Sequence, residues 1–125
     1  MTPKRSPSPG SRIDARLAEL VADTMFALSS PIRVQILGCL LEGPRAVGEL
    51  VETLGVEQSA VSHQLRILRE YTIVSAERVG RQRVYALYDE HVTDLIEGAL
   101  RHVEQRQRKS AGKRLSRSRR AVSEG

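Results

Sequence analysis

Residues 57–71, EQSAVSHQLRILREY, repeat apolar side chains at steps of three and four, as one face of an α-helix requires. Val61, Leu65 and Leu68 form this apolar face. The other face carries short or forked hydrogen-bonding side chains: Gln58, Ser59, Ser62, His63 and Arg66. Such side chains suit the base edges of a DNA major groove, whereas a merely solvated helix more often shows Glu–Lys pairs. Taken alone, the pattern is more common in ordinary surface helices, so the neighbouring segments decide its meaning.

Three helices are predicted before this segment, because apolar stripes alternate with capping and breaking residues. The first runs from Asp14, an N-cap, to about Ser29, the second is Pro31–Leu41 and the third is Val47–Leu54. Gly55 follows and can adopt the left-handed conformation that a sharp turn often needs. A helix, a tight glycine turn and a second helix with a polar face make up the helix-turn-helix arrangement.

The pattern changes from helical to strand-like after residue 71. Ile73–Val79 and Arg83–Leu87 alternate as strands do, and residues 80–82 between them are predicted to form a hairpin tip. Three arginines cluster at this tip: Arg78, Arg81 and Arg83. A basic two-stranded wing after a recognition helix can reach neighbouring phosphates or the minor groove of DNA. The alternative is a solvated hairpin with ordinary surface arginines.

A last helix is predicted from Asp89 to about Gln107, with an apolar stripe made of Val92, Leu95, Ile96, Ala99, Leu100 and Val103. The first helix has a comparable stripe, made of Leu17, Leu20, Val21, Thr24, Met25 and Leu28. The chain has too little else to cover both stripes, which predicts a homodimer that pairs through its first and last helices. The expected fold is mainly α with a small β-hairpin, a homodimeric winged helix-turn-helix of order α-α-α-α-β-β-α.

A length of 125 residues indicates one small domain with tails. We expect residues 1–13 to form a disordered N-terminal arm, residues 14–107 the DNA-binding and dimerisation domain, and residues 108–125 a basic disordered tail. The single cysteine, Cys39, excludes an intrachain disulfide and lies in an apolar run, which favours a buried thiol. No stretch approaches the ~18 apolar residues of a membrane span, and no secretion signal is recognisable. A cytoplasmic protein without membrane contact is expected.

The net charge of +5 hides an asymmetry along the chain. Residues 1–13 carry +3, and residues 105–125, with eight basic and one acidic residue, carry +7. Residues 14–104, with nine basic and fourteen acidic residues, carry −5. Attraction to DNA must therefore come from the local placement of arginines in an acidic fold, with help from the tails; these arginines are Arg66, Arg69, Arg78, Arg81 and Arg83.

Over about residues 15–107 the chain resembles the ArsR/SmtB family of metal-responsive bacterial repressors. The most specific match is QSAVSHQLRILRE followed by RVGRQRVYALYDEHV, and ALSSPIRVQILGCL also looks like the second helix of that family. The resemblance implies a double-stranded operator as partner, with the wing tip at Arg81 beside it. It further implies that four helix residues face the operator: Gln58, Ser59, Ser62 and His63.

The same resemblance implies a site for a divalent metal effector. One type of member uses cysteines in the helix before the recognition helix, and the matching stretch here, AVGELVETL, has none. Another type uses the last helix, where this chain offers Asp89, His91 and His102. The two histidines are eleven residues apart, so they share a face but lie ~16 Å apart along one helix. Two antiparallel last helices in a dimer would bring Asp89 and His91 of one chain to His102 of the other.

Two imidazoles and a carboxylate suit Zn²⁺, Ni²⁺ or Co²⁺, and no organic cofactor is expected. The departure from the family pattern is Gln105, a poor ligand where the family supplies His or Glu. Glu104, Gln105 or water would have to complete the shell, and Glu104 points about 100° away from Gln105 on an ideal helix. The alternative is that Asp89 only caps the helix and that both histidines are polar interface residues.

The leading hypothesis is therefore a dimeric repressor that leaves its operator when a metal ion binds between the C-terminal helices. The alternative is a repressor of the same family that does not sense metal and is regulated by another ligand, by redox or by a partner. A hydrolase built on Ser59, Ser62 and His63 is disfavoured, because no acidic residue is placed to orient the histidine and no Gly-rich oxyanion turn adjoins it. We expect no enzymatic activity.

Overall fold

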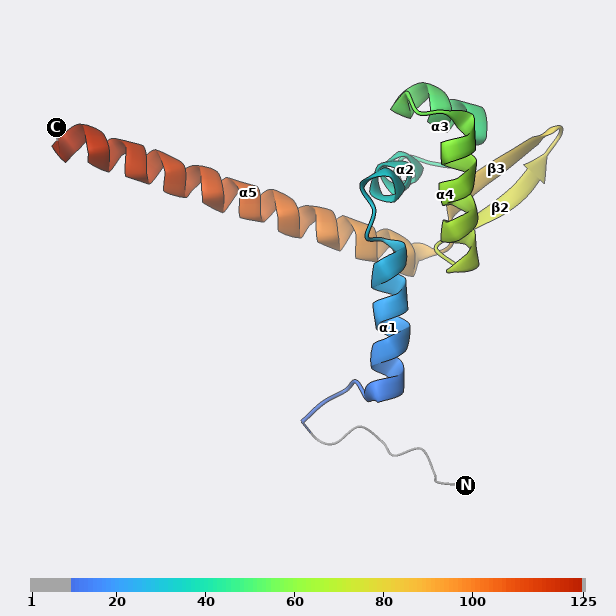
Figure 1. The fold of residues 1–125 in the computed structure, drawn as a ribbon, viewed down its shortest axis with the longest axis horizontal. Coiled ribbons are helices and arrows are strands. Elements are labelled where there is room, and N and C mark those ends of the chain that lie inside the picture. Colours follow the sequence, from blue (N-terminus) through green and yellow to red (C-terminus); the bar gives the residue numbers. More distant parts are fainter. Residues whose placement is uncertain (1–9, 125) are drawn as a thin grey trace. The chain divides into compact units, whose positions relative to one another are not determined.

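Helices predominate along the chain, and Figure 1 colours them in sequence order. The computed structural model describes the backbone of residues 10–124 and the side chains of residues 10–113, so residues 1–9 of the predicted N-terminal arm lie outside it. The elements are α1 (Ala15–Ala27), α2 (Pro31–Leu41), β1 (Arg45–Ala46), α3 (Val47–Leu54), α4 (Gln58–Glu70), β2 (Val74–Val79), β3 (Gln82–Leu87) and α5 (Glu90–Glu124). Residues up to Tyr88 form one unit, and the segment from Asp89 forms a second.

Local chemistry explains where α2 and α3 begin and end. Pro31 occupies the first position of α2, where its missing N–H costs nothing. At the start of α3, the Glu49 carboxylate accepts a hydrogen bond of 3.1 Å from the backbone N–H of Ala46. The helix ends at Gly55, whose φ of 65° is left-handed. The predicted bounds of both helices and the glycine turn between α3 and α4 are confirmed.

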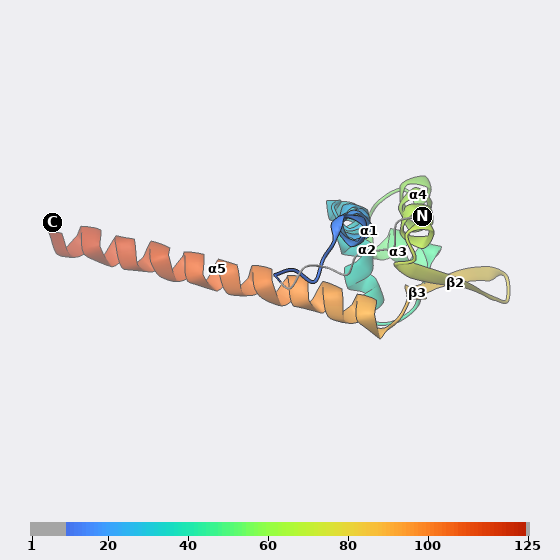
Figure 2. The same cartoon turned by 90° about the horizontal axis from the view of Figure 1, so that it is seen from below.

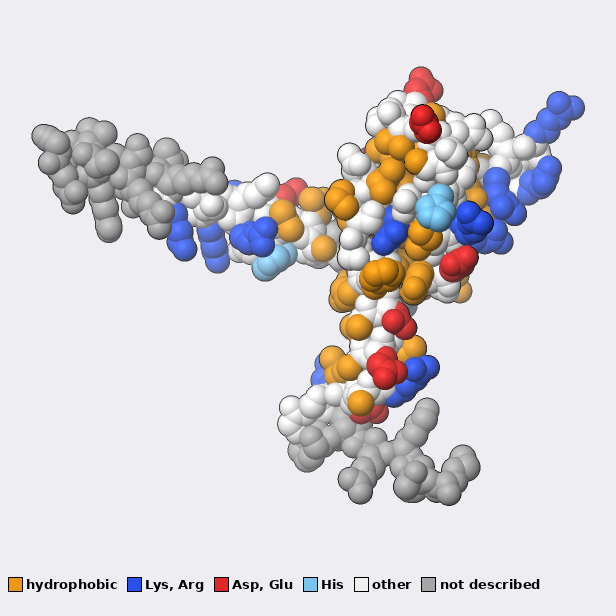
Figure 3. All heavy atoms as spheres, in the orientation of Figure 1, with side chains coloured by type: hydrophobic (Ala, Val, Ile, Leu, Met, Phe, Trp, Pro, Cys, Tyr) orange, Lys and Arg blue, Asp and Glu red, His pale blue; other side chains and the backbone are white. Residues whose placement is uncertain are grey.

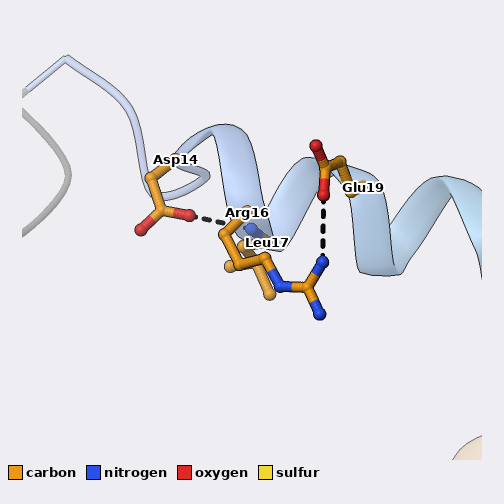
Figure 4. Close-up of polar contacts among 4 residues, drawn as sticks. All are labelled: Asp14, Arg16, Leu17 and Glu19. Carbon is orange, nitrogen blue, oxygen red and sulfur yellow. Dashed lines mark hydrogen bonds and ion pairs between the residues drawn. The ribbon is translucent and has the colours of Figure 1, made fainter. Parts of the chain in front are cut away.

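The first helix begins at the predicted cap and leaves its apolar stripe exposed. Asp14 Oδ1 accepts a hydrogen bond of 2.8 Å from the backbone N–H of Leu17, and an exposed ion pair of 3.0 Å joins Arg16 to Glu19 (Figure 4). Its helical part ends at Ala27, two residues before the predicted end at Ser29. The exposed large apolar side chains of α1 are Leu17, Leu20, Val21, Met25 and Phe26.

The hydrophobic core of the first unit lies between α2, α3, α4 and the sheet. The predicted apolar face of α4 is at its centre, since Val61, Leu65 and Leu68 are all 0% exposed. Burying a side chain of this size contributes about 1.5–3 kcal/mol. Cys39 is free and half-buried. The other core residues around α4 are Ile36, Leu37, Leu40, Ala46, Leu50, Ile73, Val74 and Tyr85.

The sheet has three strands in the order β1-β3-β2, all antiparallel, where the sequence predicted only a two-stranded hairpin. The extra strand, β1, pairs Arg45 with Tyr85, and its two residues are too few to show a period of two. Val79 pairs with Gln82, so the turn is the two residues Gly80 and Arg81. Gly80 has a φ of 63°, as the first position of a tight hairpin turn requires. The hairpin tip extends beyond the helices in both views (Figures 1 and 2).

The junction between α4 and β2 is a Schellman motif with a threonine in the position that glycine usually takes. The backbone N–H of Ile73 bonds to the Leu68 carbonyl at 2.9 Å, and that of Thr72 bonds to the Arg69 carbonyl at 3.0 Å. Thr72 has a φ of 59°, which is costly for a β-branched residue. Burial of Ile73 just after it holds the conformation in place.

The second unit consists of α5, which is longer than predicted. The sequence placed its end near Gln107, whereas the helix continues to Glu124 and includes most of the basic tail. Arg, Lys and Ala are good helix formers, and no proline interrupts this stretch, so low hydrophobicity alone was a poor guide to where the helix ends.

Among the described residues, no single helix has the length and hydrophobicity to cross a membrane; only α1 and α2 together, bent by 84°, meet that requirement.

Replacing Thr72 by Gly should stabilise the protein. The substitution removes a left-handed strain of roughly 1–2 kcal/mol and adds roughly 0.5–1 kcal/mol of unfolded-chain entropy. We expect a net gain of about 0.5–1 kcal/mol in the free energy of unfolding, measured by urea denaturation at fixed protein concentration. The matched control is Thr53→Gly within α3, which should destabilise by about 0.5 kcal/mol, the difference between Thr and Gly in a helix. Equal losses at both positions would contradict the strain.

Candidate nucleic-acid interface and metal ligands

The polar face of α4 is turned outward because its opposite face fills the core. All eight residues that the sequence assigned to DNA are exposed. A hollow opens between α4 and β3, lined by Val47, Ser59, Ser62, His63, Arg66, Arg69, Arg83 and Tyr85. The structure therefore brings five of the predicted residues together around one depression, whereas Gln58, Arg78 and Arg81 lie outside its lining.

Three residues of this lining, Val47, Arg69 and Tyr85, were not among the eight predicted site residues. Arg69 lies three positions after Arg66, and Tyr85 lies two positions after Arg83. Residues three apart share a face of a helix and residues two apart share a face of a strand, so both could have been found from the periodicity. Tyr85 is largely buried, yet it borders the hollow from the sheet.

The hollow is strongly cationic. Three guanidinium groups line it, from Arg66, Arg69 and Arg83, and none of its lining residues is acidic. In the described part of the chain, the ion pairs within 4.0 Å involve Arg16, His91 and Arg101 instead. The three arginines thus present uncompensated positive charge, and a bound polyanion would neutralise it.

One contact inside the hollow bears on how His63 can act. Its Nδ1 lies 3.5 Å from Nη2 of Arg66. The guanidinium can only donate in such a contact, and Nε2 of the ring remains available to contact a base edge. A histidine that activates a nucleophile needs a carboxylate to orient it, and the neighbour of His63 is a cation.

The hairpin adds charge beyond the hollow. Arg78 and Arg83 are directly paired across the two strands, and Arg81 lies in the turn. Figure 3 shows the Lys and Arg side chains gathered over this hairpin. Like charges that face each other across strands destabilise a sheet unless an anion lies nearby. The hairpin therefore fits a negatively charged partner.

The three predicted metal ligands all belong to the second unit. Asp89 Oδ1 accepts a hydrogen bond of 3.1 Å from the backbone N–H of Val92, and this bond, more than the contact with His91, lowers the pKa of the carboxyl group. Asp89 Oδ2 lies 3.5 Å from Nδ1 of His91, whose side chain is 94% exposed. Asp89 is thus an N-cap with its second oxygen beside a histidine.

His102 lies eleven residues beyond His91 on the same helix, about 16 Å further along its axis. Within the described residues, no group of three or more His, Cys, Asp or Glu side chains could hold a metal ion in a single chain. The donor chemistry fits a divalent metal only if a second chain supplies His102.

The sequence is similar to those of known bacterial regulatory proteins. The profile described as bacterial regulatory protein, arsR family, matches residues 30–76. The transcriptional regulator NmtR of Mycobacterium tuberculosis is 48% identical over 96 residues, which are 77% of this chain and 80% of NmtR. A transcriptional repressor SmtB homolog of Synechocystis is 38% identical over 70% of this chain and 67% of that protein.

Solved structures agree with these matches. The solution structure of apo-NmtR covers 84% of this chain and 87% of that chain, with a TM-score of 0.66 and 45% identity. The homodimeric winged helix-turn-helix DNA-binding domain of a possible ArsR-family regulator from Mycobacterium bovis has a TM-score of 0.70 and 29% identity. It covers 76% of this chain and 88% of that domain.

The guanidinium of Arg69 should contribute to the binding of double-stranded DNA of any sequence. Replacing Arg69 by Ala should weaken binding uniformly and lower the slope of log affinity against log salt by about one unit, because one phosphate contact is lost. Fluorescence anisotropy with a labelled duplex at several salt concentrations measures this slope. Arg16→Ala, which removes an exposed arginine already paired with Glu19, is the control and should leave the slope unchanged. An unchanged slope for Arg69→Ala would remove it from the interface.

Proposed function

Because the chain belongs to the ArsR family of bacterial regulatory proteins, whose winged-helix members repress transcription, we propose that it is a dimeric repressor released from its operator by a divalent metal ion. The observation that carries this proposal is the hollow between α4 and β3, where the polar face of α4 and three unpaired guanidinium groups converge. In this reading the protein acts on the bacterial chromosome and hence in the cytoplasm, and it has no catalytic role.

The proposal divides operator recognition between two kinds of contact. The first turns of α4 would enter the major groove and read base edges with Gln58, Ser59, Ser62 and His63. Arg66, Arg69 and Arg83 in the hollow would hold the phosphate backbone, and Arg78 and Arg81 on the hairpin would reach the flanking phosphates or minor groove. The basic C-terminal part of α5 would add attraction that is independent of sequence.

A homodimer through the first and last helices is the proposed assembly. The apolar side chains of α1 are exposed, and Figure 3 shows hydrophobic groups along that helix. In α5, Leu100 and Val103 are exposed as well. Apolar stripes of this kind mark protein interfaces, and the related domain from M. bovis is homodimeric. A two-fold dimer would present two copies of α4 to palindromic half-sites about one DNA turn apart.

The metal would bind between the two copies of α5. Asp89 and His91 of one chain and His102 of the other supply a carboxylate and two imidazoles, a set that suits Zn²⁺, Ni²⁺ or Co²⁺. Glu104, Gln105 or water would complete the shell. The absence of a three-ligand cluster among the described residues of one chain is consistent with a shared site.

One observation favours the alternative regulation. Asp89 Oδ1 already caps α5, so its carboxylate has a structural role without any metal. A repressor of the same family that responds to another ligand, to redox or to a partner would keep the same α4 and hairpin. Metal binding and DNA binding are therefore tested separately.

Ser62→Ala or His63→Ala should lower affinity for the operator more than affinity for random duplex DNA. Loss of one base contact is expected to cost about 1–3 kcal/mol of discrimination. Anisotropy with both duplexes gives the ratio of the two affinities, and Ser75→Ala, an exposed serine of β2, is the matched control. If Gln58, Ser59, Ser62 and His63 can all be replaced by Ala with operator affinity intact, α4 is not the reading helix.

Calorimetry with Zn²⁺, Ni²⁺ and Co²⁺ tests the metal site. His102→Ala should abolish binding of the effector metal, whereas Gln107→Ala, an exposed polar residue of the same helix, should not. Saturating operator DNA should weaken metal binding by the same factor by which metal weakens DNA binding, because the coupling is reciprocal. Unchanged metal affinity on the operator would defeat the release mechanism, and absence of binding would favour the alternative.

A further inference from the structure

Within residues 10–113, the first helix is buried only in its C-terminal turn. Residues 15–23 of α1 are all exposed, whereas Ala27 in its last turn is fully buried. Most of α1, including its apolar stripe, is therefore exposed. The direction of the helix depends on the contacts at its C-terminal end.

The first of these contacts is made by Arg33 of α2. Arg33 is only 9% exposed, and its guanidinium has no carboxylate within 4.0 Å among the described residues. Its Nε donates to the Ala27 carbonyl at 2.7 Å, and its Nη2 donates to the Phe26 carbonyl at 3.3 Å. The charge is stabilised instead by the carbonyl groups at the negative end of α1, which fixes the last turn of that helix.

The same guanidinium reaches α4. Its Nη1 donates to Gln64 Oε1 at 3.1 Å. A guanidinium has no acceptor, so the amide oxygen of Gln64 must face it, and the side chain is held in one orientation. Arg33 thus binds the end of α1 and the middle of α4 at once.

A second contact joins the same two helices. The ring of Phe26 lies against the ring of Tyr71, with centroids 6.5 Å apart and planes inclined by 59°. Tyr71 is the C-cap of α4, seven residues after Gln64, so the two lie on one face of the helix, two turns apart. This face is neither the buried face of Leu65 nor the outer face that lines the hollow.

We infer that Arg33–Gln64 and Phe26–Tyr71 form a two-point tether that sets the direction of the dimerising helix α1 relative to the reading helix α4, and hence the spacing of operator half-sites that the dimer accepts. The inference rests on the proposed dimeric operator binding. Two points two turns apart define an angle as well as a position. A change in how two copies of α1 meet would be transmitted to α4 rather than lost in a loose joint.

The test measures selectivity for spacing. Wild-type protein first selects an operator from a random-sequence duplex library, and the central spacer of that duplex is then changed by −1 and +1 base pair. Wild type should prefer the selected spacing. Gln64→Leu keeps the side-chain volume but removes the acceptor, and the preference should fall about five-fold or more, the lower end of usual coupling between sites. Tyr71→Leu, which removes the second point, should act in the same direction.

Three comparisons separate the tether from loss of stability or of DNA contacts. Gln64→Glu keeps an acceptor for Arg33 and should retain the preference, even if its charge weakens binding at every spacing. Gln35→Leu makes the same substitution at an exposed glutamine of α2 and should behave as wild type. Affinity for an isolated half-site duplex should be unchanged in Gln64→Leu.

Equal weakening of Gln64→Leu at all three spacings, or an unchanged preference, would overturn the tether while leaving the repressor function intact. Failure of the wild type to select any sequence would instead refute the proposed function. The two failures are therefore distinguishable.

Discussion

Burial of one face of α4 is the constraint on which the rest of the structure depends. Val61, Leu65 and Leu68 are sealed against α2, α3 and the sheet, and this fixes the rotation of the helix about its own axis. A rotation of 100° would exchange an apolar side chain for its neighbour and expose the core. Because the rotation is fixed, Ser59, Ser62, His63 and Arg66 must face outward together, and β3 brings Arg83 to the same side. The outward polar face of α4 is thus a consequence of core packing, and its cost in stability is small since polar groups there remain solvated.

Charge placement separates this unit from a generally basic DNA-binding protein. The central part of the chain is acidic, so long-range attraction cannot come from its net charge. The positive potential is instead concentrated in the hollow and on the hairpin, where arginines lack carboxylate partners within the described residues. Unpaired like charges such as Arg78 and Arg83 destabilise the free protein slightly. In the proposed complex with DNA, phosphates near these arginines would relieve that repulsion and so favour the complex over the free state.

In the proposed mechanism, α5 would bind the metal and α4 would bind DNA, and the two-fold dimer would connect the two events. His91 and His102, two of the proposed ligands, lie about 16 Å apart along one helix, so the proposed metal site would exist only in the dimer. The apolar face of α1 would be covered in the same dimer, and Arg33 would connect that helix to α4. A repressor built in this way needs no pocket for an effector inside the monomer. The effector would act on how two chains meet, and operator affinity would respond because the half-sites have a fixed separation.

The sequence by itself determined most of the local structure. Hydrophobic periodicity predicted the buried face of α4, whereas capping and breaking residues predicted the bounds of α2 and α3. Pro31 and Gly55 marked helix boundaries through backbone conformations that few other residues take. The sequence also predicted that the arginines of the hairpin would be exposed near its tip, because residues near a tight turn face solvent. The family resemblance added the proposed roles of Asp89, His91 and His102.

Only the tertiary structure decided which side chains meet. It added β1, too short to show a period, and it joined Arg69 and Tyr85 to the hollow from two separate elements. It also revealed the left-handed Thr72 and the buried Arg33, neither of which is recognisable from residue type. Periodicity reports the face on which a residue lies. Whether Arg33 can bond the carbonyl groups at the end of α1 and also Gln64, 31 residues further along the chain, depends on how the helices cross. That crossing is fixed by packing of the whole core, which no local pattern contains.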